Sequence, residues 1–514
     1  MTTMPRLNIA VVGQADPSIA GRVDLIIGQL ANANANAGKL FKNMQLKTNA
    51  ELDALFGART DLRHKIKNFL KNNRLSRLDV QTLEEDATGA PAVSTIVVAG
   101  TASADAELEV SVVSEKDFKR TLTISSGETN EQIATKISNA FAVGVFPTIP
   151  VTSSVLTDTV SFTAVDKGTV GNYYSVKVKG VVPGVTFTVN AFAAGANDPV
   201  YTSAIFPVAR YTGVAVPQWL KASVDNITDV LDARFNSDNA IMDGVAFMAL
   251  DDTVSNLNTF ASGKNSKALV LIGNGNAPAT HPDPDTVVKG KAICHPTDWA
   301  VCEFTGIRAR RLTAGAPIAD FVTATGLDNF GGPELASFPY FNTPMVGVPT
   351  TQADTLFINS EIIALETAGY SVIGVNTAES GMLMGSVSTT YKTDALGNED
   401  ATFKFLEFVD TGSVIREYIF NKMKADLAQM RLTDGAVIPG RNIQNKATIK
   451  GLFMGYIADL AEAVLVQAGK ASQISEKTSI LLSLKNRLVT ITSEIPIVTQ
   501  IGTVNMVLVQ KFSI

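Results

Sequence analysis

Histidine and cysteine, the side chains most often used for catalysis and metal binding, are few in this sequence. The histidines are His64, His281 and His295, and the cysteines are Cys294 and Cys302. Cys294 and His295 are adjacent, but a zinc site needs more ligands at closer spacing, so we predict no metal ion here. Two cysteines make no disulfide framework. Buried, reduced thiols are the expected state in a protein made in a cytoplasm.

A glycine-rich turn after an apolar run invites a nucleotide-binding interpretation. The run covers residues 268–272 and the turn covers residues 273–276. The turn lacks both the GxGxxG spacing of dinucleotide-binding folds and the Lys-Ser/Thr pair of a P-loop. The GxSxG, HExxH and CxxC motifs are also absent from the sequence. We therefore predict no catalytic residue and no cofactor, while an enzyme whose site lacks a local signature stays an alternative.

Charge and length limit the class of protein. The 514 residues carry 43 basic and 49 acidic side chains, a formal net charge of -6. A general nucleic-acid binder needs a basic surface that releases counterions from phosphates, so we expect no direct contact with nucleic acid. With 46% hydrophobic and 18% charged residues, the chain is typical of a globular protein. Its length predicts roughly two to four domains.

Neither a membrane span nor a signal peptide is expected. The sequence has no uninterrupted apolar run of about 18 residues, the length that a spanning helix needs. The first residues, MTTMPRLNIAVVGQ, are too short and too polar at their flanks for a secretory signal. We therefore expect the protein to be made and folded in a cytoplasm.

Both ends of the sequence alternate between apolar and other residues, a pattern that predicts strands. The alternating positions on one side of these two strands are Leu7, Ile9, Val11, Val504, Met506 and Leu508. Chain termini are usually polar and frayed, so an apolar terminal strand must have a pairing partner. That partner is either the subunit's own sheet, for example at residues 488–491, or the edge of a neighbour's sheet.

The chain between the two terminal strands begins with an α/β pattern. Residues 21–86 combine apolar strands with two helices that begin at Thr48 and Thr60. Glu51 stands three positions after Thr48, which is the capping-box spacing. Residues 87–205 are rich in Val, Thr, Ser and Gly, and their short strands predict an inserted sandwich or small barrel.

Alternating strands and helices return in residues 206–380 and predict the second part of the same α/β layer. Helices are expected over residues 216–235 and 292–313. Arg308, with two further arginines close behind it, suits the C-terminal end of the second helix.

The last block, residues 381–499, is predicted to be an α+β unit. A strand over residues 382–391 and an extended segment over residues 403–407 precede two helices, at residues 415–430 and 446–467. Residues 1–20 and 500–514 then form arms at the two ends.

Short motifs spread along the chain resemble contractile phage tail sheath proteins of the Mu-like branch. Residues 388–394, with the residues that follow to position 402, resemble the family's TYQTN…G…D hairpin, and Ile415–Arg–Glu–Tyr418 resembles its YIVRYL segment. Residues 339–344, PYFNTP, are similar to its RPYFNTP element. Weaker matches, in the family's order, are residues 27–29, 48–51, 55–57 and 171–172. The first twenty and last fifteen residues do not match the family's motifs, so the pairing partners of the two terminal strands stay open.

The resemblance implies a multidomain tail-sheath architecture, α/β and α+β, with an inserted β-rich outer domain and a C-terminal domain carrying strand arms. It implies a helical homo-oligomer around an inner tail tube, with baseplate and tail terminator proteins as further partners. The terminal strands would join a neighbour's C-terminal sheet, and the C-terminal domain would lie inward against the tube. We expect the helix of residues 446–467, or the loop before it, to make that contact. The tube-facing candidates on that helix are Lys446, Lys450, Asp459 and Glu462. The protein would be part of a virion tail and assemble in the host cytoplasm.

Two alternatives stay open beside a phage tail sheath. One is the sheath of a related contractile injection device, a bacteriocin-like tail or a secretion system. The other is a protein of a different class, either a surface binding protein that uses the β-rich domain or an unrecognised enzyme. An open-ended assembly that depends on the termini separates the sheath interpretation from the second alternative.

Overall fold

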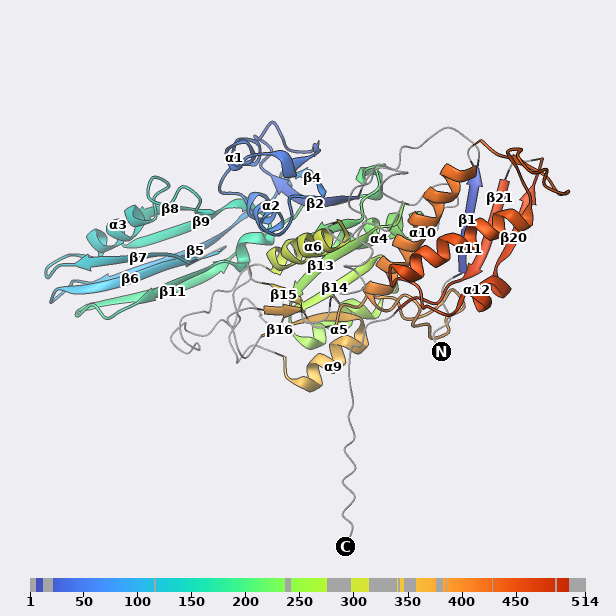
Figure 1. Cartoon of the computed structure of the whole chain (residues 1–514). Helices are drawn as coiled ribbons and strands as arrows, with labels where there is room; N and C mark the ends of the chain where they lie inside the picture. The colour runs from blue at the N-terminus through green and yellow to red at the C-terminus, as the bar shows by residue number, and fades with distance from the viewer. Residues whose placement is uncertain are drawn as a thin grey trace, which may run out of the picture.

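A central sheet, an inserted β-rich unit and a terminal unit make up the described part of the chain (Figure 1). The computed structural model describes residues 6–12, 22–114, 117–235, 242–274, 297–313, 340, 343–345, 357–375, 382–384, 386–427, 429–485 and 488–498. Parallel and antiparallel sheets occur together with helices. This mixture confirms the predicted α/β and α+β class.

The central sheet has nine strands in the order β15-β17-β16-β14-β13-β12-β2-β4-β3. Their bounds are β2 (Val23–Leu30), β3 (Leu40–Phe41), β4 (Arg77–Glu84), β12 (Gly213–Val216), β13 (Val245–Asp251), β14 (Leu269–Asn274), β15 (Thr343–Met345), β16 (Tyr370–Val375) and β17 (Met382–Met384). The strands from β16 to β4 pair in parallel. Parallel strands are covered on both faces, which explains why every residue of β2 is buried.

Helices cover the two faces of this sheet and divide its core in two. They are α2 (Asp61–Asn72) and α6 (Thr297–Thr313) on one face, and α4 (Val224–Arg234), α5 (Val254–Ser262) and α9 (Asn359–Ala368) on the other. Successive side chains of β2 point to opposite faces. Ile26 therefore joins the first core, while Leu25 and Ile27 join the second.

The predicted starts of the first two helices are confirmed. Helix α1 (Asn49–Phe56) follows Thr48, whose amide donates to Glu51 Oε2 at 2.8 Å, while the Glu51 amide donates to Thr48 Oγ1 at 3.3 Å. This is the reciprocal capping box that the spacing of the two residues indicated. Thr60 caps α2 by accepting a hydrogen bond from the Arg63 amide.

The β-rich unit contains two antiparallel sheets and a helix around a core of its own. One sheet has the order β10-β6-β7 and the other β11-β5-β9-β8. The bounds are β5 (Pro91–Gly100), β6 (Ala106–Val113), β7 (Asp117–Ile124), α3 (Asn130–Ala140), β8 (Val151–Leu156), β9 (Thr159–Lys167), β10 (Ser175–Lys179) and β11 (Val185–Ala193). All buried residues of this core lie within residues 92–192. Figure 1 shows the unit extending from one end of the molecule.

The terminal unit lies at the other end of the molecule and joins both ends of the described chain (Figure 1). It contains α10 (Leu406–Leu427), α11 (Lys446–Glu462), α12 (Ala471–Lys477), β20 (Ser479–Ser483) and β21 (Leu488–Glu494). The N-terminal strand β1 (Arg6–Val12) completes its sheet in the order β1-β21-β20.

Several predicted boundaries in the last block are wrong. Helix α10 begins at Leu406, inside a segment predicted to be extended and well before the predicted start at residue 415. Thr411, Gly412 and Ser413 interrupt the apolar period, but burial of Leu406 and Val409 outweighs their weak helix propensity. Helix α11 ends at Glu462 instead of residue 467. The strand predicted over residues 382–391 is limited to β17 among the described residues.

Two further differences concern the helix predicted over residues 216–235 and the β20 strand. The first part of that predicted helix is 3-10 over Gln218–Ser223, and the α-helix starts at Val224. Strand β20 was not predicted because its five residues follow α12 with only one residue between them. The strand predicted over residues 503–512 lies outside the described residues.

Candidate functional site

Strand β1 lies along β21 over its whole length, although the two strands come from opposite ends of the chain. The antiparallel register runs from Arg6 opposite Glu494 to Val12 opposite Leu488. Strand β20 pairs with the other side of β21, from Ser479 opposite Thr492 onward. The outer edge of β20 has no strand partner among the described residues. The sheet therefore has β21 at its centre, one strand from the N-terminus and one edge that is open in the described part of the chain.

The predicted arm residues are only partly within the described chain. Leu7, Ile9 and Val11 stand opposite Ser493, Ile491 and Val489 in the β1–β21 ladder. Val504, Met506 and Leu508 lie outside the described residues. Ser493, Ile491 and Val489 are all buried, and directly opposed residues share one face of a sheet. The register thus fixes which residues of β21 the three N-terminal positions oppose.

Helix α11 carries the four residues predicted to face the tube. Lys446 and Glu462 are exposed at its two ends, and Lys450 is half-buried between them. Asp459 is also half-buried, and its carboxylate accepts a hydrogen bond from the Tyr418 hydroxyl at 2.7 Å. Asp459 therefore has a structural role, whereas the other three side chains form no such hydrogen bond within the described part of the chain.

An open groove of about 430 Å³ follows α11. Gln444, Thr448, Gly451, Leu452, Gly455, Tyr456 and Asp459 line it. A Cβ atom placed at Gly451 or at Gly455 would meet no atom within 4 Å. Packing within the described chain therefore does not require glycine at either position, although glycine weakens a helix relative to alanine.

Two tyrosine–aspartate pairs connect α10 to α11. Tyr418 of α10 donates to Asp459 of α11, and Tyr456 of α11 donates to Asp426 of α10. The two tyrosine rings meet edge to face, with centroids 6.4 Å apart. Burial and the neighbouring Asp426 raise the pKa of Tyr456, so this hydroxyl keeps its proton and acts as a donor.

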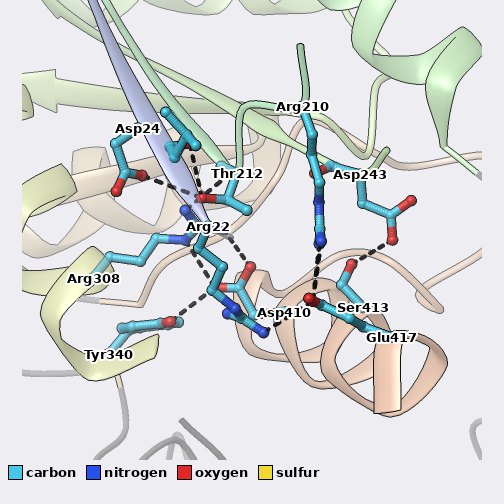
Figure 2. A network of polar contacts seen from close by, with 11 residues as sticks. Arg22, Asp24, Arg210, Thr212, Asp243, Arg308, Tyr340, Asp410, Ser413 and Glu417 are labelled. Carbon is cyan, nitrogen blue, oxygen red and sulfur yellow. Dashed lines mark hydrogen bonds and ion pairs between the residues drawn. The ribbon is translucent and has the colours of Figure 1, made fainter. Parts of the chain in front are cut away.

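A buried ionic network joins α10 to the central sheet and to α6 (Figure 2). Arg308 of α6 donates two hydrogen bonds to the Asp410 carboxylate. One of them runs from Nε to Oδ2 at 2.8 Å, and the other from Nη2 to Oδ1. The third contact of Arg308 is Nη1 to the carbonyl oxygen of Thr212 at 3.1 Å. The Tyr340 hydroxyl donates to Asp410 Oδ2 at 2.8 Å. Two-nitrogen arginine–carboxylate pairs are among the strongest and most directional contacts in proteins.

A second group of contacts lies one to two turns further along α10. Glu417 lies against two arginines, with Oε2 at 3.1 Å from Arg210 and at 3.5 Å from Arg22. The Ser413 hydroxyl donates to Asp243 Oδ2 at 2.7 Å, and Arg416 pairs with the same aspartate. We call this network the α10 joint; its charged members are Arg22, Arg210, Arg308, Arg416, Asp24, Asp243, Asp410 and Glu417. The four positive groups balance the four acids when every acid is ionised.

Asp24 of β2 is the member of the α10 joint with the weakest contacts. Its carboxylate accepts long hydrogen bonds, 3.4 Å each, from Ser76 and Thr212. Burial raises the pKa of Asp24 to about 7, although the nearby Arg308 opposes this shift. Burial alone would lower the pKa of the Arg308 guanidinium, but the neighbouring Asp410 outweighs burial and raises this pKa.

Sequence reasoning did not find the α10 joint. The sequence predicts Arg308 to be a helix-end charge, but only 2% of its surface is exposed and it pairs with Asp410. The available signal was Asp410 and Glu417, two acids one heptad apart on the apolar face of α10. Tyr340 lies in the PYFNTP segment, which the sequence marked only by resemblance.

The described residues contain no cluster of three or more potential metal-ligating side chains. None of the helices in the described ranges has the length and apolar character needed to cross a membrane.

Comparison with known proteins finds similar tail sheath proteins. No protein-family model matches the sequence. The Mu-like prophage FluMu tail sheath protein of Haemophilus influenzae is 23% identical over 468 residues, which cover 88% of this chain and 85% of that protein. The sheath tail protein Lin1278 from Listeria innocua has a similar structure with a TM-score of 0.47 and 10% identity, covering 94% of this chain and 93% of that one. The chain is thus similar over most of its length to a Mu-like phage tail sheath protein, as its motifs predicted.

Proposed function

We propose that this chain is the structural subunit of a contractile phage tail sheath, with no enzymatic activity. Similarity to a tail sheath protein over most of the chain supports the structural role. One observation supports the mode of assembly, namely the terminal sheet in which β1 completes a ladder with β21 from the opposite end of the chain.

The β1–β21 ladder is suited to exchange between subunits. A ladder is made of main-chain hydrogen bonds, so an identical strand from a neighbour forms the same contacts. In the proposal β1, with Leu7, Ile9 and Val11, moves to the sheet of one neighbour. Residues 500–514, with Val504, Met506 and Leu508, are donated to another. Such head-to-tail contacts do not close on themselves, so they build a helical array.

The remaining parts take roles in the proposed array that fit their surfaces. The domain of residues 381–499 faces the inner tail tube, and the domain of residues 87–205 faces outward. Lys446, Lys450 and Glu462 of α11 are available for a tube contact beside the groove. The open space at Gly451 and Gly455 suits a close approach by the tube protein.

In the proposed mechanism, contraction rotates whole subunits while the exchanged strands keep them linked. The α10 joint supports this mechanism, because it fastens the terminal unit to the central sheet through buried ion pairs. A contracted packing that buries more surface supplies the driving force without a nucleotide. Baseplate and tail terminator proteins delimit the array. The array is part of a virion tail that is assembled in the host cytoplasm.

Proline substitutions in β1 test the strand exchange. Successive amides of a strand point to opposite sides, so Asn8→Pro combined with Ile9→Pro removes one that faces β21 in any register. We expect this variant to lose self-assembly in sedimentation assays while the inserted unit stays folded. The matched control, Asn8→Thr with Ile9→Val, should assemble as the wild type does. Unchanged assembly of the proline variant, or of a chain without residues 500–514, would show that the arms are not the links.

A further inference from the structure

A short antiparallel pairing holds the chain immediately before the proposed C-terminal arm. The Gln467 amide donates to the Pro496 carbonyl at 2.9 Å, and the Val498 amide donates to the Leu465 carbonyl at 3.1 Å. Val466 and Ile497 stand opposite each other between these two bonds. We call this pairing of residues 465–467 with residues 496–498 the C-terminal anchor.

Side chains reinforce the C-terminal anchor. The Gln467 side chain donates through Nε2 to the Ile497 carbonyl at 2.9 Å. Leu465, Val466 and Ile497 are buried in the same core as α11 and β21. The anchor is therefore a packed part of the terminal unit, continuous with its core.

The turn that leads into the anchor has an unfavourable conformation. Val464 has φ of 60°, in the left-handed region that β-branched residues rarely adopt, and 53% of its surface is exposed. Its amide donates to Ala461, and the next amide, of Leu465, reaches back to Leu460. This turn ends α11, because one more helical turn would carry residues 465–467 away from residues 496–498.

Strained backbone of this kind persists only where the surrounding structure enforces it. Val464 itself contributes little to the core, since half of its side chain is exposed. The bonds of Gln467 and Val498 are the contacts that the turn makes possible. The strain at Val464 is thus coupled to the anchor.

We infer that the C-terminal anchor fixes the point at which the C-terminal arm leaves its subunit. Residues 488–498 then stay with their own subunit, and only residues after Val498 are donated to a neighbour. The inference rests on the proposed strand exchange and sets its boundary. It also assigns Val464 a positioning role, because the left-handed turn aims residues 465–467 at residues 496–498.

Hydrogen–deuterium exchange of the unassembled full-length protein tests the anchor separately from assembly. We expect the amides of Gln467 and Val498 to exchange slowly, like those in β21. Val464→Gly, which tolerates the left-handed conformation, should raise their protection by about fivefold. Val464→Pro cannot adopt positive φ and should abolish the protection, while amides of β21 stay protected in both variants. Rapid exchange at Gln467 and Val498 in the wild type would overturn the inference.

A disulfide across the anchor tests the donated boundary. Val466 and Ile497 form a pair without mutual hydrogen bonds, in which side chains come closest, so Val466→Cys with Ile497→Cys should cross-link. The test uses a chain in which Cys294 and Cys302 are replaced by alanine. We expect oxidised and reduced protein to assemble equally. Assembly of the reduced form alone would show that residues 496–498 must leave, and failure of both forms with a protected anchor would count against the sheath function instead.

Discussion

Gly213 leaves room for two charged groups of the α10 joint. A Cβ atom at this position would lie 2.5 Å from Asp24 Oδ1 and 3.0 Å from Arg308 Nη1. Both side chains are buried, so neither has space to move aside. A side chain at position 213 would therefore clash with these two charged groups, so glycine is required there for steric reasons.

Gly213→Ala should destabilise the protein by about 1–3 kcal/mol, the usual cost of overpacking a filled interior. Chemical unfolding of the full-length chain measures this change. Gly263→Ala is a suitable control, because a Cβ there meets no atom within 4 Å and its φ of -89° is allowed for alanine. Equal stability of the two variants would contradict the packing argument.

Asp24 should make stability depend on pH. Its folded pKa, about 7, lies above its ordinary value of 3.8, so the folded protein binds the proton more tightly than the unfolded chain. The resulting stabilisation is complete below about pH 4 and is lost as the pH rises through about 7. Asparagine stays neutral at every pH, so Asp24→Asn does not lose stability as the pH rises. The unfolding free energy of the variant minus that of the wild type should therefore increase with rising pH. Parallel pH profiles would show that Asp24 does not titrate this way.

At the scale of elements, α10 and α11 depend on hydrogen bonds that differ in exposure. Asp459 is half-buried, whereas Asp426 is exposed to solvent. Loss of a donor is costly when the acceptor cannot turn to water. The Tyr418–Asp459 bond should therefore stabilise the helix pair more than the Tyr456–Asp426 bond.

Tyr418→Phe should lower the free energy of unfolding by about 1 kcal/mol, and Tyr456→Phe by less. The two variants remove the same hydroxyl group from two sites of the same helix pair, so each is the control for the other. Thermal unfolding in parallel measures both. A larger effect of Tyr456→Phe would contradict the ranking by exposure.

How far the sequence predicts the elements depends on where their partners lie. The start of α1 was predictable because Thr48 and Glu51 are close in sequence and cap each other locally. The start of α10 was not, because its first turns are stabilised by distant contacts, such as Arg308 to Asp410. The anchor was missed for the same reason, since residues 465–467 pair with residues about thirty positions later.

At the scale of the whole molecule, β1 and β21, from the two ends of the described chain, pair in one unit, and the β-rich unit lies on the opposite side of the central sheet (Figure 1). The α10 joint fastens the terminal unit to this sheet, and the C-terminal anchor fixes the base of its last segment. A subunit built in this way is suited to move as one body while its terminal strands hold neighbours. The α10 joint and the C-terminal anchor are the two features of the subunit that only the three-dimensional structure reveals.

The proposed function requires open-ended self-assembly through the termini. Negative-stain electron microscopy of the purified full-length protein at rising concentration tests it most directly. We expect hollow tubes or stacks of rings whose length grows with concentration, and we expect the variant with Asn8→Pro and Ile9→Pro to form none. Compact, closed oligomers of a fixed size at every concentration would contradict it.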